Sequence, residues 1–277
     1  MAYKKILTIQ DISCVGQCSL TVALPILSAC GHETCILPSS VLSTHTCGFT
    51  DFTVRDLSED MPSINRHWIK ENIKFDAFCT GYLGSNEQID YVIDIMETTS
   101  AENCVKIIDP AMADNGKLYP AFDMNYVEAM KKLCKEADIL LPNITEACFL
   151  TDTDYRENYD QKFIEELLLK LEKMGAKNIV ITGVGYGEGK TGIAIREKGI
   201  NSYFEHEKLD RSFHGTGDIY TAAFAGALMC GKSIFESVKI AAEYTLESMK
   251  ITIKDDDHWY GVKFEKAIPF LIKELEL

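Results

Sequence analysis

One glycine-rich segment combines residue types that suit phosphoryl transfer. Gly215, Thr216, Gly217 and Asp218 precede a run of small residues, 221–227, that indicates a helix. Glycines let backbone N–H groups converge, and a helix N-terminus adds positive potential, so the segment could bind an anion. Asp218 could contact an attacking hydroxyl group. Asp is also a favoured N-cap, so a purely structural role stays open.

Polar and acidic residues also gather where strand-like runs end. Ligands of open α/β sheets bind beyond the carboxyl ends of the strands, so these residues are candidates for a site. The residues concerned are Asp11, Ser39–Thr46, Gly81–Tyr82, Asp109–Asp114, Asn143–Glu146 and Gly183.

The elements that must position these residues alternate between strands and helices. Nearly continuous apolar runs predict strands buried on both faces. They are Ile6–Gln10, Thr34–Leu37, Ala77–Thr80, Val105–Asp109, Ile139–Leu141 and Asn178–Thr182. Helical patterns cover Ser19–Ala29, Glu87–Glu97, Asn125–Glu136, Asp160–Met174, Asp218–Met229, Ser233–Lys250 and Phe264–Glu274. Thr191–Arg196 and Asn201–Glu207 predict an antiparallel hairpin.

This alternation predicts an α/β fold with three layers. Right-handed crossovers would place helices on both faces of a mostly parallel sheet, and the hairpin would form an antiparallel edge. No linker or repeat interrupts the chain, so we expect one domain over residues 1–277, with residues 38–60 as a candidate flap.

Two other glycine motifs lack the context that nucleotide binding requires. Lys190 and Thr191 end a segment like a Walker A loop, but Val184 replaces its first glycine. Gly187, Gly189 and Gly192 fit a dinucleotide fingerprint. Both motifs need a helix directly afterwards, and a strand pattern follows instead. We therefore expect a flexible turn into the hairpin.

Composition excludes several classes of function. The net charge of -14 argues against nucleic-acid binding and against an acidic membrane surface. No apolar run reaches the length of a transmembrane helix, and the N-terminus does not read as a signal peptide, so we expect a cytoplasmic protein. Ten cysteines without a CxxC pair indicate reduced, mostly buried thiols. A metal cluster of Cys30, His32 and Cys35 is the weaker alternative.

Several segments together resemble the ribokinase-like superfamily and, within it, the pyridoxal kinases. His214–Asp218 resembles the superfamily's GTGD signature, and the other similarities appear in order along almost the whole chain. They are Ile9–Asp11, Ser43–Gly48, Cys79–Tyr82, Ile107–Tyr119 and Leu141–Glu146. The resemblance implies ATP-dependent phosphorylation of the 5′-hydroxymethyl group of pyridoxal, pyridoxine or pyridoxamine, by a homodimer.

The resemblance also implies roles on the phosphate side of the site. Asp218 matches the catalytic aspartate, and Gly215, Thr216 and Gly217 match the anion hole. Acidic positions around Mg²⁺ and the phosphates correspond to Asp109, Asp114 and Glu146, which are hard oxygen ligands. Further nucleotide contacts correspond to Tyr119, Asn143, Thr182 and Gly183. Leu141 replaces a common threonine, so a requirement for K⁺ stays open.

The substrate side is implied in the same way. Tyr82 matches the position that stacks on the pyridine ring, His45 and Thr46 match flanking positions, and Cys18 matches a small apolar contact. Asp11 replaces the usual serine. A carboxylate there could pair with an ammonium group or a protonated ring, so we hypothesise a shifted preference toward pyridoxamine.

Some alternatives stay open at this stage. Glu146 could simply cap a helix that begins near Ile144, Tyr82 could be core packing, and His45 could be a satisfied loop histidine. A helix N-terminus should lower the pKa of Asp218, which favours a role as an orienting acceptor. The rival activity is phosphorylation of hydroxymethylpyrimidine, although pyrimidine-type kinases resemble GTGC where this chain has Asp218. A vitamin-binding protein without catalysis is the third hypothesis.

Overall fold

The computed structural model describes residues 3–277 and contains one large sheet. Its strands are β1 (Lys5–Ser13), β2 (Glu33–Leu42), β3 (Val54–Asp56), β4 (Phe75–Thr80), β5 (Ser100–Ile108), β8 (Ile139–Leu140), β9 (Asn178–Val184), β10 (Lys190–Glu197) and β11 (Ile200–Glu207). Their spatial order is β11-β10-β9-β8-β5-β4-β1-β2-β3. The run from β9 to β2 is parallel, whereas β10, β11 and β3 are antiparallel to their neighbours.

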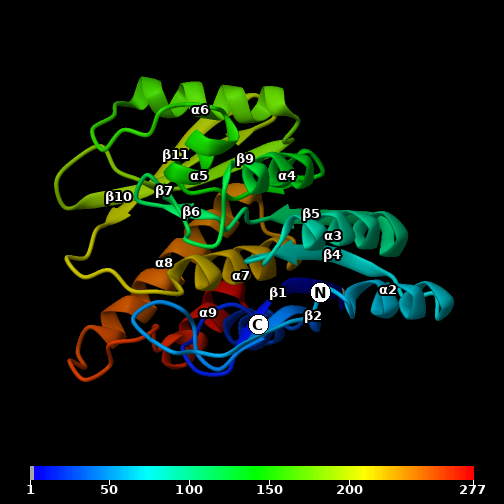
Figure 1. The fold of residues 1–277 in the computed structure, drawn as a ribbon. Coiled ribbons are helices and arrows are strands. Elements are labelled where there is room, and N and C mark those ends of the chain that lie inside the picture. The colour runs from blue at the N-terminus through cyan, green and yellow to red at the C-terminus, as the bar shows by residue number, and fades with distance from the viewer. Residues whose placement is uncertain (1–2) are drawn as a thin grey trace.

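Helices cover both faces of this sheet, which confirms the predicted three-layer α/β/α arrangement (Figure 1). One face carries α2 (Met61–Lys70), α3 (Asn86–Thr99), α4 (Met124–Lys135), α5 (Ile144–Leu150) and α6 (Gln161–Met174). The other carries α1 (Leu20–Ala29), α7 (Thr216–Met229), α8 (Ile234–Thr252) and α9 (Ile268–Leu275), which follows the 3-10 turn Phe264–Ala267.

The strands feed two separate cores because their side chains alternate between faces. In β4, Phe78 joins the core under α2–α6, whereas Ala77 and Cys79 join the core under α7 and α8. Both sets are fully buried. This explains why the strands read as continuous apolar runs, with no alternation of polar residues.

All six predicted parallel strands and the hairpin are present, and some elements were not predicted. The short edge strand β3, the helix α2 and a two-stranded hairpin of β6 (Ala113–Asp114) and β7 (Lys117–Leu118) were missed. The candidate flap narrows to residues 43–53, because its ends belong to β2 and β3. The glycine-rich segment after β9 turns directly into β10, as predicted, and no helix begins there.

Two findings concern classes of site away from the sheet edge. Among residues 3–277, no helix is long and apolar enough to cross a membrane. All ten cysteines are free thiols. Cys30 and His32 do not lie with Cys35 but near Cys230, whose Sγ is 3.5 Å from His32 Nε2. Within the described chain, no three His, Cys, Asp or Glu side chains are grouped to hold a metal ion by themselves.

Candidate active site

The N-terminus of α7 lies at the carboxyl ends of the central strands. Its N-cap is Gly215, whose φ of 80° is left-handed. A Cβ there would lie 2.4 Å from the carbonyl oxygen of Gln17, so both the conformation and the space require glycine. Close packing continues along the helix, since a Cβ on Gly226 would lie 2.4 Å from Cys30 Sγ. The small residues of α7 therefore let it approach α1 closely and aim its first turn at the sheet edge.

Asp218 lies in that first turn and is held by the loop between β1 and α1. The backbone N–H of Ser19 donates to Asp218 Oδ2 at 2.9 Å. The pKa of Asp218 is raised from 3.8 to about 6: burial raises it most, the Ser19 hydrogen bond lowers it, and the nearby Asp11 carboxylate also raises it. The predicted lowering was wrong, because loss of hydration outweighs the favourable helix terminus.

Asp109 directly follows β5 and is linked to α7. The hydroxyl of Thr221, one turn after Asp218, donates to Asp109 Oδ2 at 2.8 Å. The backbone N–H of Asp109 donates to Thr80 Oγ1 at 3.2 Å. Burial raises the pKa of the Asp109 carboxyl, the Thr221 hydrogen bond lowers it, and Asp218 raises it. Two sequence-distant carboxylates therefore share one small volume.

Glu146 has a structural role that the sequence left open. It forms a capping box at the start of α5: Asn143 N–H donates to Glu146 Oε2 at 2.8 Å, and Glu146 N–H donates to Asn143 Oδ1 at 2.9 Å. The other oxygen, Oε1, accepts from Met112 N–H at 3.1 Å. Burial raises the pKa of Glu146, and Asp109 raises it further. The capping interpretation is confirmed. The Glu146 carboxylate also lies close enough to Asp109 for their charges to repel each other.

The hairpin of β6 and β7 carries Asp114 to the surface. Its turn is Asn115–Gly116, with φ values of 50° and 76°, the pair of left-handed residues typical of tight hairpins. Asp114 is exposed and accepts from Asn115 N–H at 2.8 Å. Tyr119 follows the hairpin. Burial raises its pKa, and Glu146, Asp109 and Asp114 add to that rise. The Tyr119 hydroxyl therefore lies in the field of all three carboxylates.

The remaining phosphate-side candidates lie at the ends of β8 and β9. Asn143 donates its Nδ2–H to Ala113 O at 2.8 Å, which fixes β6 against α5. Thr182 pairs with Asn143 across a short parallel bridge. Gly183 is exposed with a φ of 74°, a left-handed conformation that favours glycine. Taken across the sheet, candidates on β9, β8 and β5 occupy one half of the edge.

The substrate-side candidates occupy the other half, on β4, β1 and β2. Asp11 lies within β1 and not after it, at an irregularity in the pairing of β1 with β2. It is 4% exposed. Its Oδ1 accepts from Ser19 Oγ at 2.6 Å and its Oδ2 from Ser13 Oγ at 3.0 Å. Burial raises the pKa of Asp11, and both hydrogen bonds lower it.

Tyr82 and Cys18 lie beside this carboxylate. Burial raises the pKa of Tyr82, and Asp11 raises it further. The half-buried Tyr82 ring lies 5.3 Å from the ring of Phe122, which stacks on Tyr126 at 3.7 Å. Burial and the charges of Asp218 and Asp11 raise the pKa of the Cys18 thiol, so it stays neutral. The Asp11 carboxylate, the Cys18 thiol and the Tyr82 ring therefore border the same space, and Phe122 supports the Tyr82 ring.

His45 and Thr46 come from the loop after β2. His45 is buried, and its Nδ1 accepts from Cys47 N–H at 3.0 Å. The neutral ring therefore carries its proton on Nε2, which has no partner within residues 3–277. The His45 ring lies 5.0 Å from Phe49 and 5.9 Å from His214. Thr46 is exposed. His45 is thus not a satisfied loop histidine.

Three residues of the site were missed by sequence reasoning. Ser19 and Thr221 bind the key carboxylates, and Phe122 supports Tyr82. Thr221 falls three residues after Asp218, on the same helix face, which is a signal that could have pointed to it. Nothing in the sequence marks Ser19 or Phe122.

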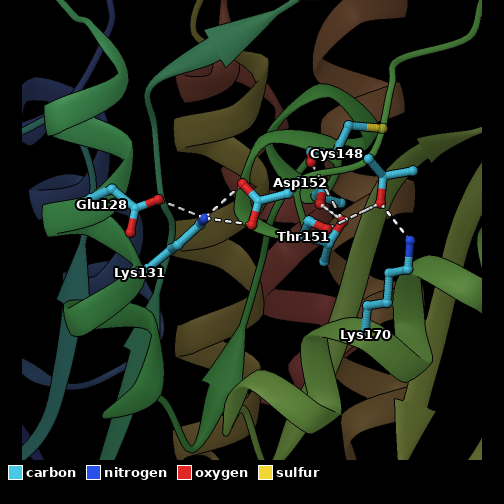
Figure 2. Close-up of polar contacts among 8 residues, drawn as sticks. Glu128, Lys131, Cys148, Thr151, Asp152 and Lys170 are labelled. Carbon is cyan, nitrogen blue, oxygen red and sulfur yellow. Dashed lines mark hydrogen bonds and ion pairs between the residues drawn. The ribbon is translucent and has the colours of Figure 1, made fainter.

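A shallow cavity of about 510 Å³ lies elsewhere, between α4, α5 and α6. Figure 2 shows that two of the lysines that line it are engaged: Lys131 Nζ donates to Glu128 and to both Asp152 oxygens at 2.7–2.9 Å, and Lys170 Nζ donates to Thr153 Oγ1 at 2.9 Å. The ends of α4 and α6 that carry these lysines lead into the amino ends of β8 and β9. The cavity is therefore a helix-joining network on the side away from Asp218.

Comparison with known proteins agrees with this geometry. Residues 26–261 match the model of a family described as phosphomethylpyrimidine kinase. The crystal structure of pyridoxal kinase from Lactobacillus plantarum is 32% identical, covers 98% of both chains and has a TM-score of 0.91. A candidate phosphomethylpyrimidine kinase from Bacteroides thetaiotaomicron, in a crystal form with pyridoxal, is 35% identical over 98% of this chain and 96% of its own, with a TM-score of 0.91.

A curated relative covers the chain to a similar extent. Pyridoxal kinase from Dictyostelium discoideum is 25% identical and covers 96% of this chain and 95% of its own length. The fold, the family model and these relatives agree with the resemblance that the motifs predicted. The chain therefore belongs to the phosphomethylpyrimidine kinase family, and with it to the ribokinase-like kinases.

Proposed function

We propose that this protein is a pyridoxal kinase, which transfers the γ-phosphoryl group of ATP to the 5′-hydroxymethyl group of pyridoxal, pyridoxine or pyridoxamine. The observation that carries the proposal is the position of Asp218. It lies at the N-terminus of α7, between the Asp11 half of the sheet edge and the Asp109 half. The pyridoxal kinase relatives and the relative crystallised with pyridoxal support the same substrate.

Asp218 accepts the hydrogen bond of the attacking hydroxyl in this proposal. A pKa of about 6 leaves the carboxylate ionised at neutral pH, and it makes Asp218 a better base than an ordinary aspartate. The first N–H groups of a helix have no intrahelical partner. Those of Thr216 and Gly217 therefore face the transferring group, whose charge they stabilise together with the helix terminus.

The carboxylates near Asp109 fit a Mg²⁺–ATP complex. The pKa of Asp109 and that of Glu146 are raised by burial and by neighbouring carboxylates, so a cation at this place would relieve their repulsion. Mg²⁺ usually keeps several waters and binds one or two carboxylates plus phosphate oxygens, so Asp109, Glu146 and Asp114 need not be grouped around it, and among residues 3–277 they are not. When bound, Mg²⁺ would neutralise charge on the phosphates. Tyr119, Asn143, Thr182 and Gly183 line the nucleotide side.

The pyridine ring is placed on the opposite side of Asp218. Tyr82 stacks on the ring, supported from behind by Phe122. His45 offers a buried Nε2–H donor that lacks a partner within the part of the chain that the structure describes, which suits an oxygen of the substrate. Asp11 accepts a positive group on the ring or its amine, with Cys18 and Thr46 completing the rim.

Phosphorylation of hydroxymethylpyrimidine is the second candidate, because the family model carries that description. Aspartate at position 218 argues against it, since pyrimidine-type kinases resemble GTGC there. The test is an assay of pyridoxal, pyridoxine, pyridoxamine and hydroxymethylpyrimidine as substrates with MgATP, in which transfer of phosphate to each compound is measured. Turnover of the B6 vitamers supports the proposal, and turnover of hydroxymethylpyrimidine alone rejects it in favour of the pyrimidine activity.

Three further features belong to the same proposal. Residues 1–277 act as one catalytic domain, since a single sheet connects both halves of the site. The active form is a cytoplasmic homodimer, which sedimentation at working concentration would test. If a monovalent cation binds near Thr182, turnover should be faster in K⁺ than in Na⁺. Equal rates in the two salts would exclude a requirement for K⁺.

A further inference from the structure

We propose that Ser19 is a positioning residue that holds the Asp218 carboxylate ready for phosphoryl transfer and ties it to Asp11 on the substrate side. The inference rests on the proposed function, because it gives Asp218 its part in the transfer. Ser19 is the residue before α1 and is 5% exposed. Ser19 belongs neither to the glycine-rich segment 215–218 nor to the residues on the nucleotide side.

Ser19 donates hydrogen bonds to two carboxylates. Its backbone N–H donates to Asp218 Oδ2 at 2.9 Å, and its hydroxyl donates to Asp11 Oδ1 at 2.6 Å. Hydrogen bonds to a charged acceptor are short and strong. One residue therefore fixes an oxygen of each carboxylate and leaves the other Asp218 oxygen for a substrate hydroxyl.

The backbone of Ser19 is strained in the way that this arrangement requires. Its φ is 56° and its ψ is -131°, a left-handed conformation that is unfavourable for any residue with a Cβ. Gly16 and Gln17, just before it, also have positive φ values, of 134° and 55°. Such strain persists only where surrounding contacts hold it, and here it aims the N–H at Asp218.

The side chain of Ser19 is diverted from the role that serine usually has before a helix. Ser85 and Ser233 cap α3 and α8 by accepting a backbone N–H, whereas Ser19 makes no such cap. Its hydroxyl goes to Asp11 instead. The Asp11 contact therefore acts as the anchor that stabilises the strained backbone, in addition to the Ser19 carbonyl, which accepts from Val22 and Ala23.

Two substitutions separate the hydroxyl from the backbone. Ser19→Ala removes the anchor but keeps a Cβ in a left-handed conformation, so the backbone should relax and the N–H should leave Asp218. Ser19→Gly also removes the anchor but tolerates positive φ. We expect kcat to fall about tenfold or more in Ser19→Ala, as for loss of a hydrogen bond to a charged group, and less than about threefold in Ser19→Gly. Equal losses in the two variants would overturn the backbone argument.

A double-mutant cycle tests whether Ser19 acts through Asp218. In the Asp218→Asn background, Ser19→Ala should lower kcat by less than about twofold, because there is no carboxylate left to position. KM for ATP should stay unchanged in all these variants. A similar tenfold loss in both backgrounds would mean a general structural effect and would overturn the inference. Ser233→Ala, which removes the cap of α8, is the matched control and should leave kcat unchanged.

The inference can fail separately from the proposed function. If the wild-type protein phosphorylates only hydroxymethylpyrimidine, the proposed function is wrong, and the same cycle on that substrate still tests Ser19. A crystal structure of Ser19→Ala needs no substrate at all. We expect the Asp218 carboxylate to be displaced there, and an unmoved Asp218 with its hydrogen bond to residue 19 intact would contradict the role of the serine hydroxyl.

Discussion

Asp218→Asn should abolish most catalysis and at the same time stabilise the fold at neutral pH. The carboxylate is ionised at pH 8, yet its surroundings raise its pKa from 3.8 to about 6. The folded state thus holds a charge that it disfavours. Asparagine removes the charge and can still accept the Ser19 N–H through its amide oxygen.

The magnitude follows from the pKa difference. Each pKa unit corresponds to about 1.36 kcal/mol, so the ionised Asp218 side chain disfavours folding by up to about 3 kcal/mol. Because Asp218 is only partly buried, solvent reduces this figure, and we expect a stabilisation of roughly 1–3 kcal/mol in Asp218→Asn. For a chain of this length, that raises Tm by roughly 2–6 °C.

The pH dependence gives the sign of the effect. Between pH 6 and pH 3.8, the folded wild type binds a proton at Asp218 that the unfolded chain does not bind. The unfavourable contribution of Asp218 to the stability of the folded wild type is therefore full above pH 6, and it disappears as the pH falls from about 6 toward 3.8. The advantage of Asp218→Asn should be full at pH 8 and should shrink as the pH falls from about 6 to about 4.

The assay is thermal and urea unfolding from pH 4.5 to pH 8, without Mg²⁺ or nucleotide. Asp256→Asn, on an exposed loop, is the control and should shift the free energy of unfolding by less than about 0.5 kcal/mol at every pH. An Asp218→Asn protein that is no more stable than wild type at pH 8, or whose advantage grows as the pH falls, would refute the argument that burial raises this pKa.

Three other substitutions test separate parts of the structure. Thr221→Val removes the hydroxyl that orients Asp109, so KM for MgATP should rise about threefold to tenfold in steady-state assays while the fold is kept; an unchanged KM would count against that role. Asp11→Ser should narrow the ratio of kcat/KM for pyridoxamine to that for pyridoxal, and a constant ratio would sink the hypothesis of ring or amine pairing. Lys131→Met breaks the network in Figure 2 and should lower the free energy of unfolding by roughly 1 kcal/mol without changing kcat, whereas a change in kcat would place this network in the catalytic machinery.

Much of the fold could be predicted because the parallel strands are buried on both faces. Their continuous apolar runs, such as Asn178–Thr182, mark the strands, and the carboxyl-end rule then places Asp109 and Tyr82 at one sheet edge. The structure adds an order that periodicity does not contain. Asp109 lies on the β5 side of the edge and Asp11 on the β1 side, with Asp218 linked to both sides.

The errors concern properties that tertiary packing decides. The pKa of Asp218 depends on how much water the fold removes around it, which no helix-terminus rule supplies. Asp11 lies inside β1 because the strand continues through an irregularity in its pairing with β2. The pattern of apolar residues in the sequence does not mark that irregularity.

Two missed elements differ in how far the sequence could have revealed them. Asn115–Gly116 is a strong turn signal that could have predicted the hairpin of β6 and β7. The left-handed conformation of Ser19 could not have been predicted, because serine rarely adopts it and tertiary contacts, among them those to Asp11 and Asp218, hold it in place.

The central claim is that Asp218 directs phosphate from ATP to the hydroxymethyl group of a B6 vitamer. The most direct measurement is the formation of pyridoxal 5′-phosphate from pyridoxal and MgATP, followed by mass spectrometry, for the wild type and for Asp218→Asn at equal concentration. We predict one product phosphate per ATP consumed in the wild type and a loss of at least about 100-fold in the variant. Wild-type ATP consumption without pyridoxal 5′-phosphate, or equal product in both proteins, would contradict the account.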